Sequence, residues 1–295
     1  MRRLKRENID ENKWNDCVKK SPNGLIYGLT WFLDALVDQW EGLIWEKNNE
    51  YTSVFPIPVR RKWGFKYVYP PFFIQQLGMF SLNGVDEQEA IMYLQKKFKF
   101  VDLNLNYKAV YGEEKINLVL SLSNDYKSIY DQYSSNHRRN LKKAIQSELN
   151  ISAAQPHEII HLFRADKGKE INTLKSKDYE RFQILTQKAD QYSCIITKGV
   201  YRSNQLICGA IFMKFKNRII FLFSGNSVQG RKYGALFLLL NDLIQQYAQS
   251  GFILDFEGSQ EEGLAKFYQG FGAKKECYTF YKHNNLPYPF RKYKD

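Results

Sequence analysis

The chain has 295 residues, of which 44% are hydrophobic and 16% aromatic, so it can bury the cores of two ordinary domains, and this composition excludes a disordered chain. Its longest apolar runs, such as residues 234–240, are too short to cross a bilayer, and its basic start lacks the apolar stretch of a signal peptide, so we expect a cytoplasmic protein. The formal net charge of +12 favours an acidic partner, either a phosphate-bearing cofactor, RNA or an anionic membrane surface.

Hydrophobic periodicity in the first half predicts two helices followed by a group of strands. We expect the helices over Glu11–Lys20 and Thr30–Gln39, and the strands over Gly42–Glu46, Tyr51–Arg61 and Phe65–Tyr69. A loop then leads into an amphipathic helix within residues 81–98 and an alternating strand over 100–105.

The second half repeats this order of elements. We expect helices around Glu158–Ala165 and Tyr179–Tyr192, strands over 194–201, 206–215 and 218–225, a loop over 226–234, a long helix to about Gln249 and a strand over 252–257. Each half carries hairpin-like strand pairs and one clear crossover helix, which favours the α+β class over one doubly wound sheet. We therefore expect two domains in tandem, 1–123 and 151–295, each a mixed, mostly antiparallel sheet flanked by helices.

A strongly basic segment at residues 124–150 is expected to bridge the two domains. Asp125 should cap one helix, and Ser134 or Ser135 should end it and help to start another. The second helix carries four cations within six residues, with no acid before Glu148: Arg138, Arg139, Lys142 and Lys143. Spacings of three and four residues place Arg139, Lys142 and Lys143 on one face. The pattern is typical of either a solvated helix face or a face that binds phosphate.

Residues 224–239 predict an anion site at a helix start, because an apolar strand leads through a polar loop with glycines into an apolar helix. A helix start offers unpaired N–H groups and the positive end of the helix dipole, and Gly230 and Gly234 would give a pyrophosphate close access to the main chain. The matching loop of the first half opens its helix with three acids: Asp86, Glu87 and Glu89. Because acids there would repel a phosphate, we expect the donor site in the second domain.

Several motifs together resemble the GNAT acyl-CoA N-acyltransferase fold. They are the loop RKYGA at 231–235 after an apolar strand, and FYQGFGA at 267–273 after LDFEGS at 254–259. The first half, with FPIPVRRKWG at 55–64, PPFFIQQLG at 70–78 and NHRRNLKKA at 136–144, resembles the FemAB-type branch, in which two GNAT-like domains occur in one chain. The resemblance covers nearly the whole chain.

The resemblance implies transfer of an acyl or aminoacyl group to an amine. In GNAT enzymes the loop after the fourth strand holds the pyrophosphate of coenzyme A, and the matching residues are Gln229, Gly230, Arg231, Gly234 and Ala235. Leu236 stands where a second small residue is usual. FemAB-type enzymes take an aminoacyl group from aminoacyl-tRNA instead, and this donor suits the basic helix. Several members that build peptidoglycan bridges also carry a long helical hairpin, for which this sequence has no room. Both donors therefore stay open.

Candidate catalytic groups lie in residues 253–274. Period-two alternation sends Asp255 and Glu257 to one face of the expected strand, where one carboxylate, desolvated near the other, could take a proton from an ammonium. By the resemblance, Tyr268 matches the tyrosine that protonates the leaving thiolate. A structural interpretation stays open beside this one, with Tyr268 in the core and the acids paired with nearby lysines.

The resemblance leads us to expect direct attack by the amine on a thioester or ester, without a metal. A backbone N–H near Phe223–Gly225 would hold the oxyanion. One alternative is aminoacyl-tRNA-dependent transfer to a cell-wall precursor, and another is a catalytically silent tandem domain that binds RNA or an anionic surface.

A rival zinc motif, HEIIH at 157–161, has Glu180 as a conceivable third ligand. Because Pro156 precedes it, both histidines should fall in the first turns of a helix, without apolar turns before them to bury a metal. We interpret this match as chance. The four cysteines, Cys17, Cys194, Cys208 and Cys277, form no CxxC pair and are expected to be reduced thiols.

Overall fold

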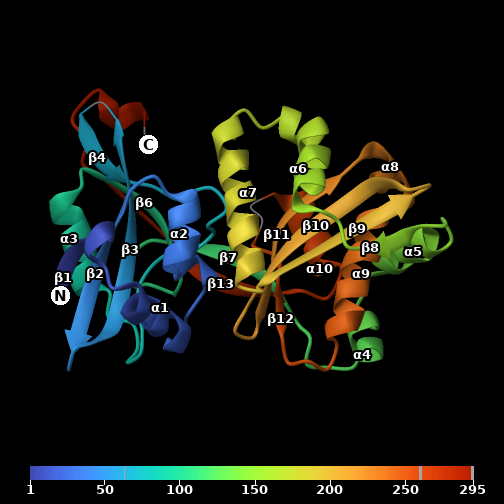
Figure 1. The fold of residues 1–295 in the computed structure, drawn as a ribbon, viewed down its shortest axis with the longest axis horizontal. Helices are drawn as coiled ribbons and strands as arrows, with labels where there is room; N and C mark the ends of the chain where they lie inside the picture. Colours follow the sequence, from blue (N-terminus) through green and yellow to red (C-terminus); the bar gives the residue numbers. More distant parts are fainter. Residues whose placement is uncertain (63, 259–260, 294–295) are drawn as a thin grey trace. The chain divides into compact units, whose positions relative to one another are not determined.

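Figure 1 shows the computed structural model, which describes residues 1–62, 64–258 and 261–293. The chain divides into two compact units, one formed by Met1–Lys115 with Cys277–Asp295 and the other by Ile116–Glu276. These boundaries differ from those expected for the domains, because the last strand of the chain joins the first unit and residues 124–150 lie within the second. Each unit combines a sheet with helices, so the expected α+β class is confirmed.

The first unit contains a sheet with the strand order β1-β2-β3-β4-β6-β13. Its strands are β1 (Arg2–Lys5), β2 (Trp40–Lys47), β3 (Glu50–Lys62), β4 (Phe65–Val68), β6 (Phe100–Leu105) and β13 (Lys274–Asn284), while β5 (Phe80–Ser81) pairs with β3. Only the β4–β6 pair among these is parallel. The helices are α1 (Glu11–Lys20), α2 (Thr30–Leu36) and α3 (Gln88–Lys97).

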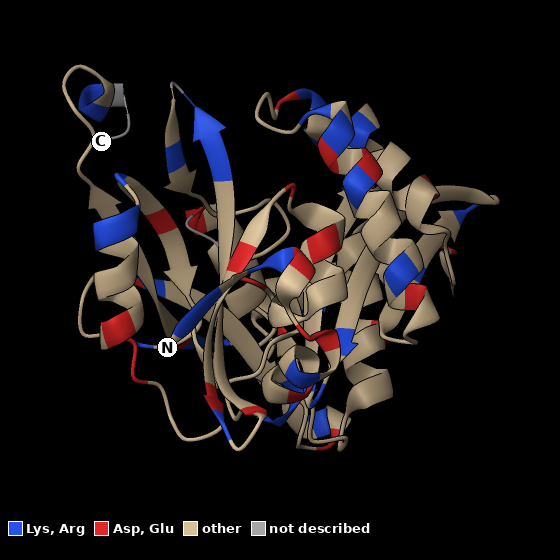
Figure 2. Ribbon diagram, turned by 60° about the vertical axis from the view of Figure 1, so that its left-hand side comes forward, with Lys and Arg blue, Asp and Glu red and all other residues tan. Residues whose placement is uncertain are grey.

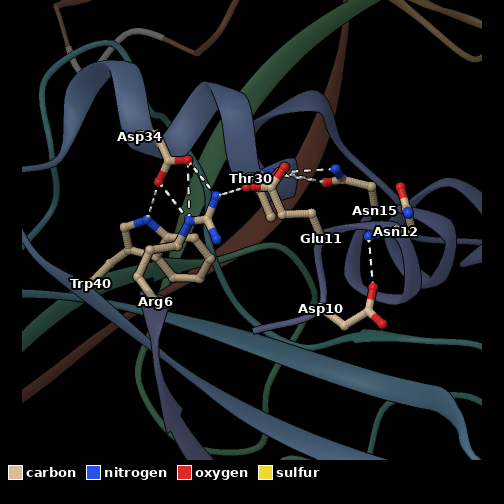
Figure 3. A network of polar contacts seen from close by, with 8 residues as sticks. All are labelled: Arg6, Asp10, Glu11, Asn12, Asn15, Thr30, Asp34 and Trp40. Atoms are coloured by element: carbon tan, nitrogen blue, oxygen red, sulfur yellow. Dashed lines mark hydrogen bonds and ion pairs between the residues drawn. The ribbon is translucent and has the colours of Figure 1, made fainter. Parts of the chain in front are cut away.

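Polar contacts hold the helices α1 and α2 of the first unit in place (Figure 3). The Arg6 guanidinium donates to both carboxylate oxygens of Asp34, and the Trp40 indole donates to the same carboxylate at 2.8 Å. Asn15 of α1 donates to the Thr30 hydroxyl at the start of α2 at 2.8 Å. The hydrogen bonds to Asp34 raise the pKa of Arg6, so its charge is already neutralised within the protein.

The second unit contains a sheet with the strand order β7-β12-β11-β10-β9-β8. Its strands are β7 (Glu113–Ser121), β8 (Asn150–Ser152), β9 (Ile195–Arg202), β10 (Gln205–Phe215), β11 (Arg218–Asn226) and β12 (Ile253–Asp255). Among these neighbours, β11 and β12 run parallel and the others antiparallel. The helices are α4 (Tyr126–Tyr130), α5 (Ser135–Ile145), α6 (Pro156–Ala165), α7 (Ser176–Gln191), α8 (Val228–Tyr233), α9 (Ala235–Tyr247) and α10 (Glu262–Gln269).

Alternation along β10 sends its side chains to two helical layers. Cys208 and Ala210 belong to the buried cluster that includes Leu239 of α9, whereas Gly209 faces Ile159 of α6. A Cβ at Gly209 would come within 2.7 Å of the Ile159 side chain, so glycine lets α6 lie close to the sheet. The sheet of the second unit is therefore covered on one face by α6 and on the other by α9.

Most expected elements are present, but the expectation of a loop over 226–234 is wrong. Val228–Tyr233 form the short helix α8, because the Ser227 side chain caps it by accepting from the Gly230 N–H at 3.0 Å. Gly234, at φ +72°, then separates α8 from α9. Within the described residues, no helix is both long enough and apolar enough to cross a membrane.

Candidate functional site

The strand β11 parts from β12 after three residue pairs. β11 pairs with β10 along most of its length, but only Arg218–Ile220 pair with β12. The register against β10 also shifts, so that Leu222 is an extra residue in β11. Such a β-bulge turns neighbouring side chains to other faces, and here Phe221 packs near Phe256 while Phe223 contacts α6 and α7 aromatics. Beyond Ile220, backbone groups of β11 on the β12 side have no ladder partner in β12.

Tyr268 of α10 lies beside this opening. Its ring stacks on Phe256 with 4.6 Å between ring centroids and meets Phe221 edge-on at 6.2 Å. The residue is only 6% exposed. Burial raises its pKa, and the charges of Glu257 and Glu261 raise it further. Tyr268 is therefore a core residue whose phenol stays protonated at neutral pH and is able to donate.

Glu257 lies near Tyr268 but not on the strand. β12 ends at Asp255, and Glu257 adopts a left-handed backbone conformation with φ +51°, so the alternation expected over 252–257 does not extend to it. The Glu257 N–H donates to the Asp255 carboxylate at 2.9 Å. Its side chain is half-buried and contributes charge to the surroundings of Tyr268.

Asp255 takes part in a buried ion pair. It is 2% exposed, and it accepts from the Arg218 guanidinium at 2.6 Å and from the Asn117 amide at 3.0 Å. Arg218 also donates to both oxygens of Glu276, at 2.9 and 3.1 Å. Burial acts to raise the pKa of Glu276, but the Arg218 hydrogen bonds prevail and hold it below its usual value. Of the three predicted catalytic residues, Glu257 directly follows Phe256, whose ring stacks on Tyr268, while Asp255 is engaged by Arg218.

The expected donor loop is already hydrogen-bonded in several places. The Gly230 N–H donates to Ser227, and a Cβ at Gly230 would lie 2.4 Å from the Ile207 carbonyl oxygen, so this glycine serves close packing. Arg231 forms an ion pair with Asp166, which follows α6. That pair lowers the pKa of Asp166 and raises that of Arg231. Gln229, in contrast, is exposed.

The start of α9 keeps the geometry of an anion site but is covered. Gly234 is its N-cap and has no side chain, so the first N–H groups of α9, beginning with Ala235, have no partner within the helix. Both residues are buried. A Cβ on Gly234 would lie 3.0 Å from the Asn140 carbonyl oxygen of α5, so α5 packs closely against the N-cap of α9.

The basic helix α5 is anchored by its apolar face and exposes its cations. The His137 Nε2–H donates to the Phe267 carbonyl oxygen at 2.7 Å, and burial lowers the pKa of His137. Leu141 and Ala144 are also buried. The predicted phosphate-binding residues are all exposed, and within the described part of the chain none of them forms an ion pair: Arg138, Arg139, Lys142 and Lys143.

A cavity of about 600 Å³ lies between α4 and α5. Its lining includes Tyr126, Tyr130, Arg138, Arg139 and Lys142, whereas Lys143 does not take part. Lys and Arg also occur elsewhere on both units, interspersed with Asp and Glu (Figure 2). The α4–α5 cavity combines exposed cations with aromatic rings, which suits an extended phosphate-bearing ligand.

The HEIIH histidines lie on α6, and both are exposed. With Glu180 of α7 they line a cavity of about 980 Å³ between the two helices. Among the described residues, no cluster of three or more His, Cys, Asp or Glu side chains is arranged to hold a metal ion.

Sequence reasoning missed four residues around the opening: Asn117, Arg218, Gly258 and Glu276. One signal was available, because Asp255 in an apolar strand needs a buried cation, and Arg218 opens the apolar strand β11. Asn117 and Glu276 gave no comparable signal, since β7 and β13 were not among the predicted strands.

No protein-family model matches the sequence, and no match was found among curated proteins. Solved structures do match. FemX has a TM-score of 0.67 at 11% identity, covering 99% of each chain, and a tandem GNAT protein from the clavulanic acid biosynthesis pathway has 0.56 at 7%, covering 97% of this chain and 99% of the other. L-PGS from Bacillus licheniformis has 0.55 at 11%, covering 95% and 94%. The chain therefore has a FemAB-like tandem GNAT fold, which confirms the resemblance seen in the sequence.

Proposed function

We propose that this protein is a transferase that moves an acyl or aminoacyl group from a phosphate-bearing donor to an amine. The observation that carries the proposal is the opening between β11 and β12, with a bulge at Leu222 and with Tyr268 and Glu257 beside it. The tandem GNAT fold supports the same class of reaction. A backbone N–H of β11 near Phe223–Gly225 would stabilise the oxyanion.

The proposed reaction needs one base and one acid. The amine enters as an ammonium, loses a proton to Glu257 and attacks the carbonyl carbon of the donor. The bond from this carbon to the donor's sulfur or oxygen breaks, and Tyr268 gives its phenolic proton to that leaving atom. The nitrogen loses its second proton to solvent, and Tyr268 and Glu257 return to their starting states through solvent. The products are an amide, a free thiol or hydroxyl, and one released proton.

An acyl-CoA donor is the first candidate. Its pyrophosphate would lie at the start of α9, on the N–H groups that follow Gly234, with Gln229 and Arg231 near it. For this, Arg231 must leave Asp166 to reach a phosphate, and α5 must leave room at Gly234, because the Asn140 carbonyl packs closely against it.

An aminoacyl-tRNA donor is the second candidate, with a cell-wall precursor as acceptor. It is favoured by the α4–α5 cavity, where Arg138, Arg139 and Lys142 face an open space beside Tyr126 and Tyr130. Cations of this kind neutralise backbone phosphates, and aromatic rings stack on unpaired bases.

The test compares donors on the intact chain. Melting temperature is measured with coenzyme A, an acyl-CoA and an aminoacyl-tRNA, and each stabilising donor is then used in single-turnover assays with amines. A donor that binds and is consumed supports the transferase. If RNA or anionic vesicles bind and no amine is ever acylated, the transferase is overturned in favour of a catalytically silent binding module.

A glycine pair identifies the acyl-CoA site. Gly234→Ala places a Cβ at the start of α9 and should abolish coenzyme A binding there. Gly251→Ala is the matched control, because Gly251 has a similar φ of +74° but no neighbour within 4 Å of its Cβ. Equal coenzyme A affinity in the two variants would remove the start of α9 as the donor site.

A further inference from the structure

A buried amide, Asn117 of β7, connects the strands of the second unit to the segment that carries Glu257. Asn117 is fully buried. Its Nδ2 donates to Asp255 at 3.0 Å and to Glu276 at 3.4 Å, and its Oδ1 accepts from the Gly258 N–H at 2.6 Å. An amide held through both its donors and its acceptor has one fixed orientation.

The same network fixes two consecutive N–H groups. Asp255, itself held by Arg218, accepts from the Glu257 N–H, and Asn117 accepts from the Gly258 N–H. No side chain fits at Gly258, because a Cβ there would lie 1.9 Å from the Ile116 carbonyl oxygen. Glu257 is thereby kept in a left-handed conformation that a non-glycine residue rarely adopts, and such backbone is found where the surroundings impose it.

We propose that Asn117 and Arg218 are positioning residues for proton transfer, which act through Asp255 and Gly258 to hold Glu257 next to Phe256, whose ring stacks on Tyr268 at 4.6 Å between centroids. Glu257, and not Asp255, then takes the proton from the amine, because the Asp255 oxygens are engaged by Arg218, Asn117 and the Glu257 N–H. The proposal deepens the transferase function and rests on it. The charged groups around Tyr268 are Glu257 and Glu261, and those around Asp255 are Arg218 and Glu276.

The first readout needs no donor. Fluorotyrosine placed at position 268 gives a single fluorine signal that follows the ionisation of this phenol. Glu257→Gln removes the charge beside it, so the phenol should ionise at lower pH. Gly258→Ala and Asn117→Ala should shift the ionisation in the same direction although Glu257 is still present, because the segment that carries it has moved.

Gly263→Ala is the matched control. Gly263 lies on α10, and nothing lies within 4 Å of a Cβ built there, so the fluorine titration should not change. A purely structural role of the network predicts lower melting temperatures for Gly258→Ala and Asn117→Ala with an unchanged titration in the folded protein. That result would overturn the positioning role whether or not the protein is an enzyme.

The second readout is kinetic. A misplaced catalytic group costs about 10²-fold in rate, so kcat should fall by that factor in Gly258→Ala and Asn117→Ala, with little change in the donor KM. In both variants, the fall of kcat at acidic pH should also disappear, as it should in Glu257→Gln. Full kcat in both variants of an active parent would overturn the proposal. A parent that acylates no amine overturns the transferase instead, and the fluorine titration alone then decides the positioning.

Discussion

Replacing Arg218 by methionine tests how strongly the second unit depends on its buried ion pair. The side chains of Arg218 and Asp255 are 17% and 3% exposed, so the substitution leaves a buried carboxylate without its cation. Removing one partner of a buried pair costs about 3–5 kcal/mol. Glu276 also loses its partner, but its side chain is 42% exposed, so water compensates and its share is at most about 1 kcal/mol. We expect the free energy of unfolding to fall by about 3–5 kcal/mol. This is a large part of the roughly 5–15 kcal/mol by which a folded domain is typically stable.

The assay is urea unfolding at neutral pH, in which the midpoint reports stability and the slope reports the surface exposed. Lys198→Met is the control, because the Lys198–Asp242 pair has a similar length of 2.6 Å but leaves behind a carboxylate that is 39% exposed, so its loss should be about 1 kcal/mol or less. The double variant Arg218→Met with Asp255→Asn removes the stranded charge and should recover part of the stability. The reasoning would be refuted if Arg218→Met lost no more stability than Lys198→Met. It would also be refuted if the double variant were no more stable than Arg218→Met.

Three further outcomes follow from named contacts. Tyr268→Phe keeps the ring stacking but removes the proton, so turnover should fall about 10²–10⁴-fold with donor affinity nearly unchanged, whereas a mere core tyrosine would lose stability and keep its specific activity. Gly230→Ala should lower the unfolding midpoint far more than Gly263→Ala, because its Cβ would meet the Ile207 carbonyl. Burial lowers the pKa of His137, so this residue binds fewer protons in the folded state than in the unfolded state. Stability should therefore fall as the pH drops below about 6.5, the ordinary pKa of histidine. In unfolding measured across pH, His137→Gln should make stability depend less on pH in this range.

Elements with a strong local period could be predicted from the sequence, and those made by distant pairing could not. The helix Glu11–Lys20 and the strand 100–105 agree with the structure at both ends. Strands β7 and β13 were missed, because β7 begins with exposed acids and finds its partner β12 more than a hundred residues later. Gly230 and the polar residues of 226–234 predict a loop, whereas the Ser227 cap stabilises the short helix α8 there.

The site could be predicted in its parts but not in its geometry. The location of Tyr268 on a short helix after a strand is a local property, and the structure agrees with it. The direction of Glu257 is not local, since its backbone conformation depends on Asn117, whose bond to Gly258 joins residues 141 positions apart. Likewise, the ion pair of Arg231 is not local, because its partner Asp166 lies 65 positions away in the sequence.

Helix α5 links the exposed cations to the proposed chemistry, and this link can be tested. Its outer face carries the exposed cations. Its buried His137 donates to the carbonyl of Phe267, the neighbour of Tyr268, and its Asn140 carbonyl lies against Gly234. An anion on the outer face would therefore be held by a helix that also contacts both α9 and α10 of the site.

The test variant changes the four cations of α5 to glutamine: Arg138, Arg139, Lys142 and Lys143. It should bind a tRNA donor more weakly. The slope of log affinity against log salt should become less steep by roughly 0.7–0.9 for each lost phosphate contact. Because these side chains are exposed and His137 is retained, the single-turnover rate at saturating donor should be unchanged. A matched variant in the first unit carries the same loss of charge, at Lys19, Lys96, Lys97 and Lys99, and should leave the salt slope as it is. Equal salt slopes of tRNA binding in the two variants would exclude α5 as the nucleic-acid contact. If both variants also still bind coenzyme A, acyl-CoA becomes the better candidate donor.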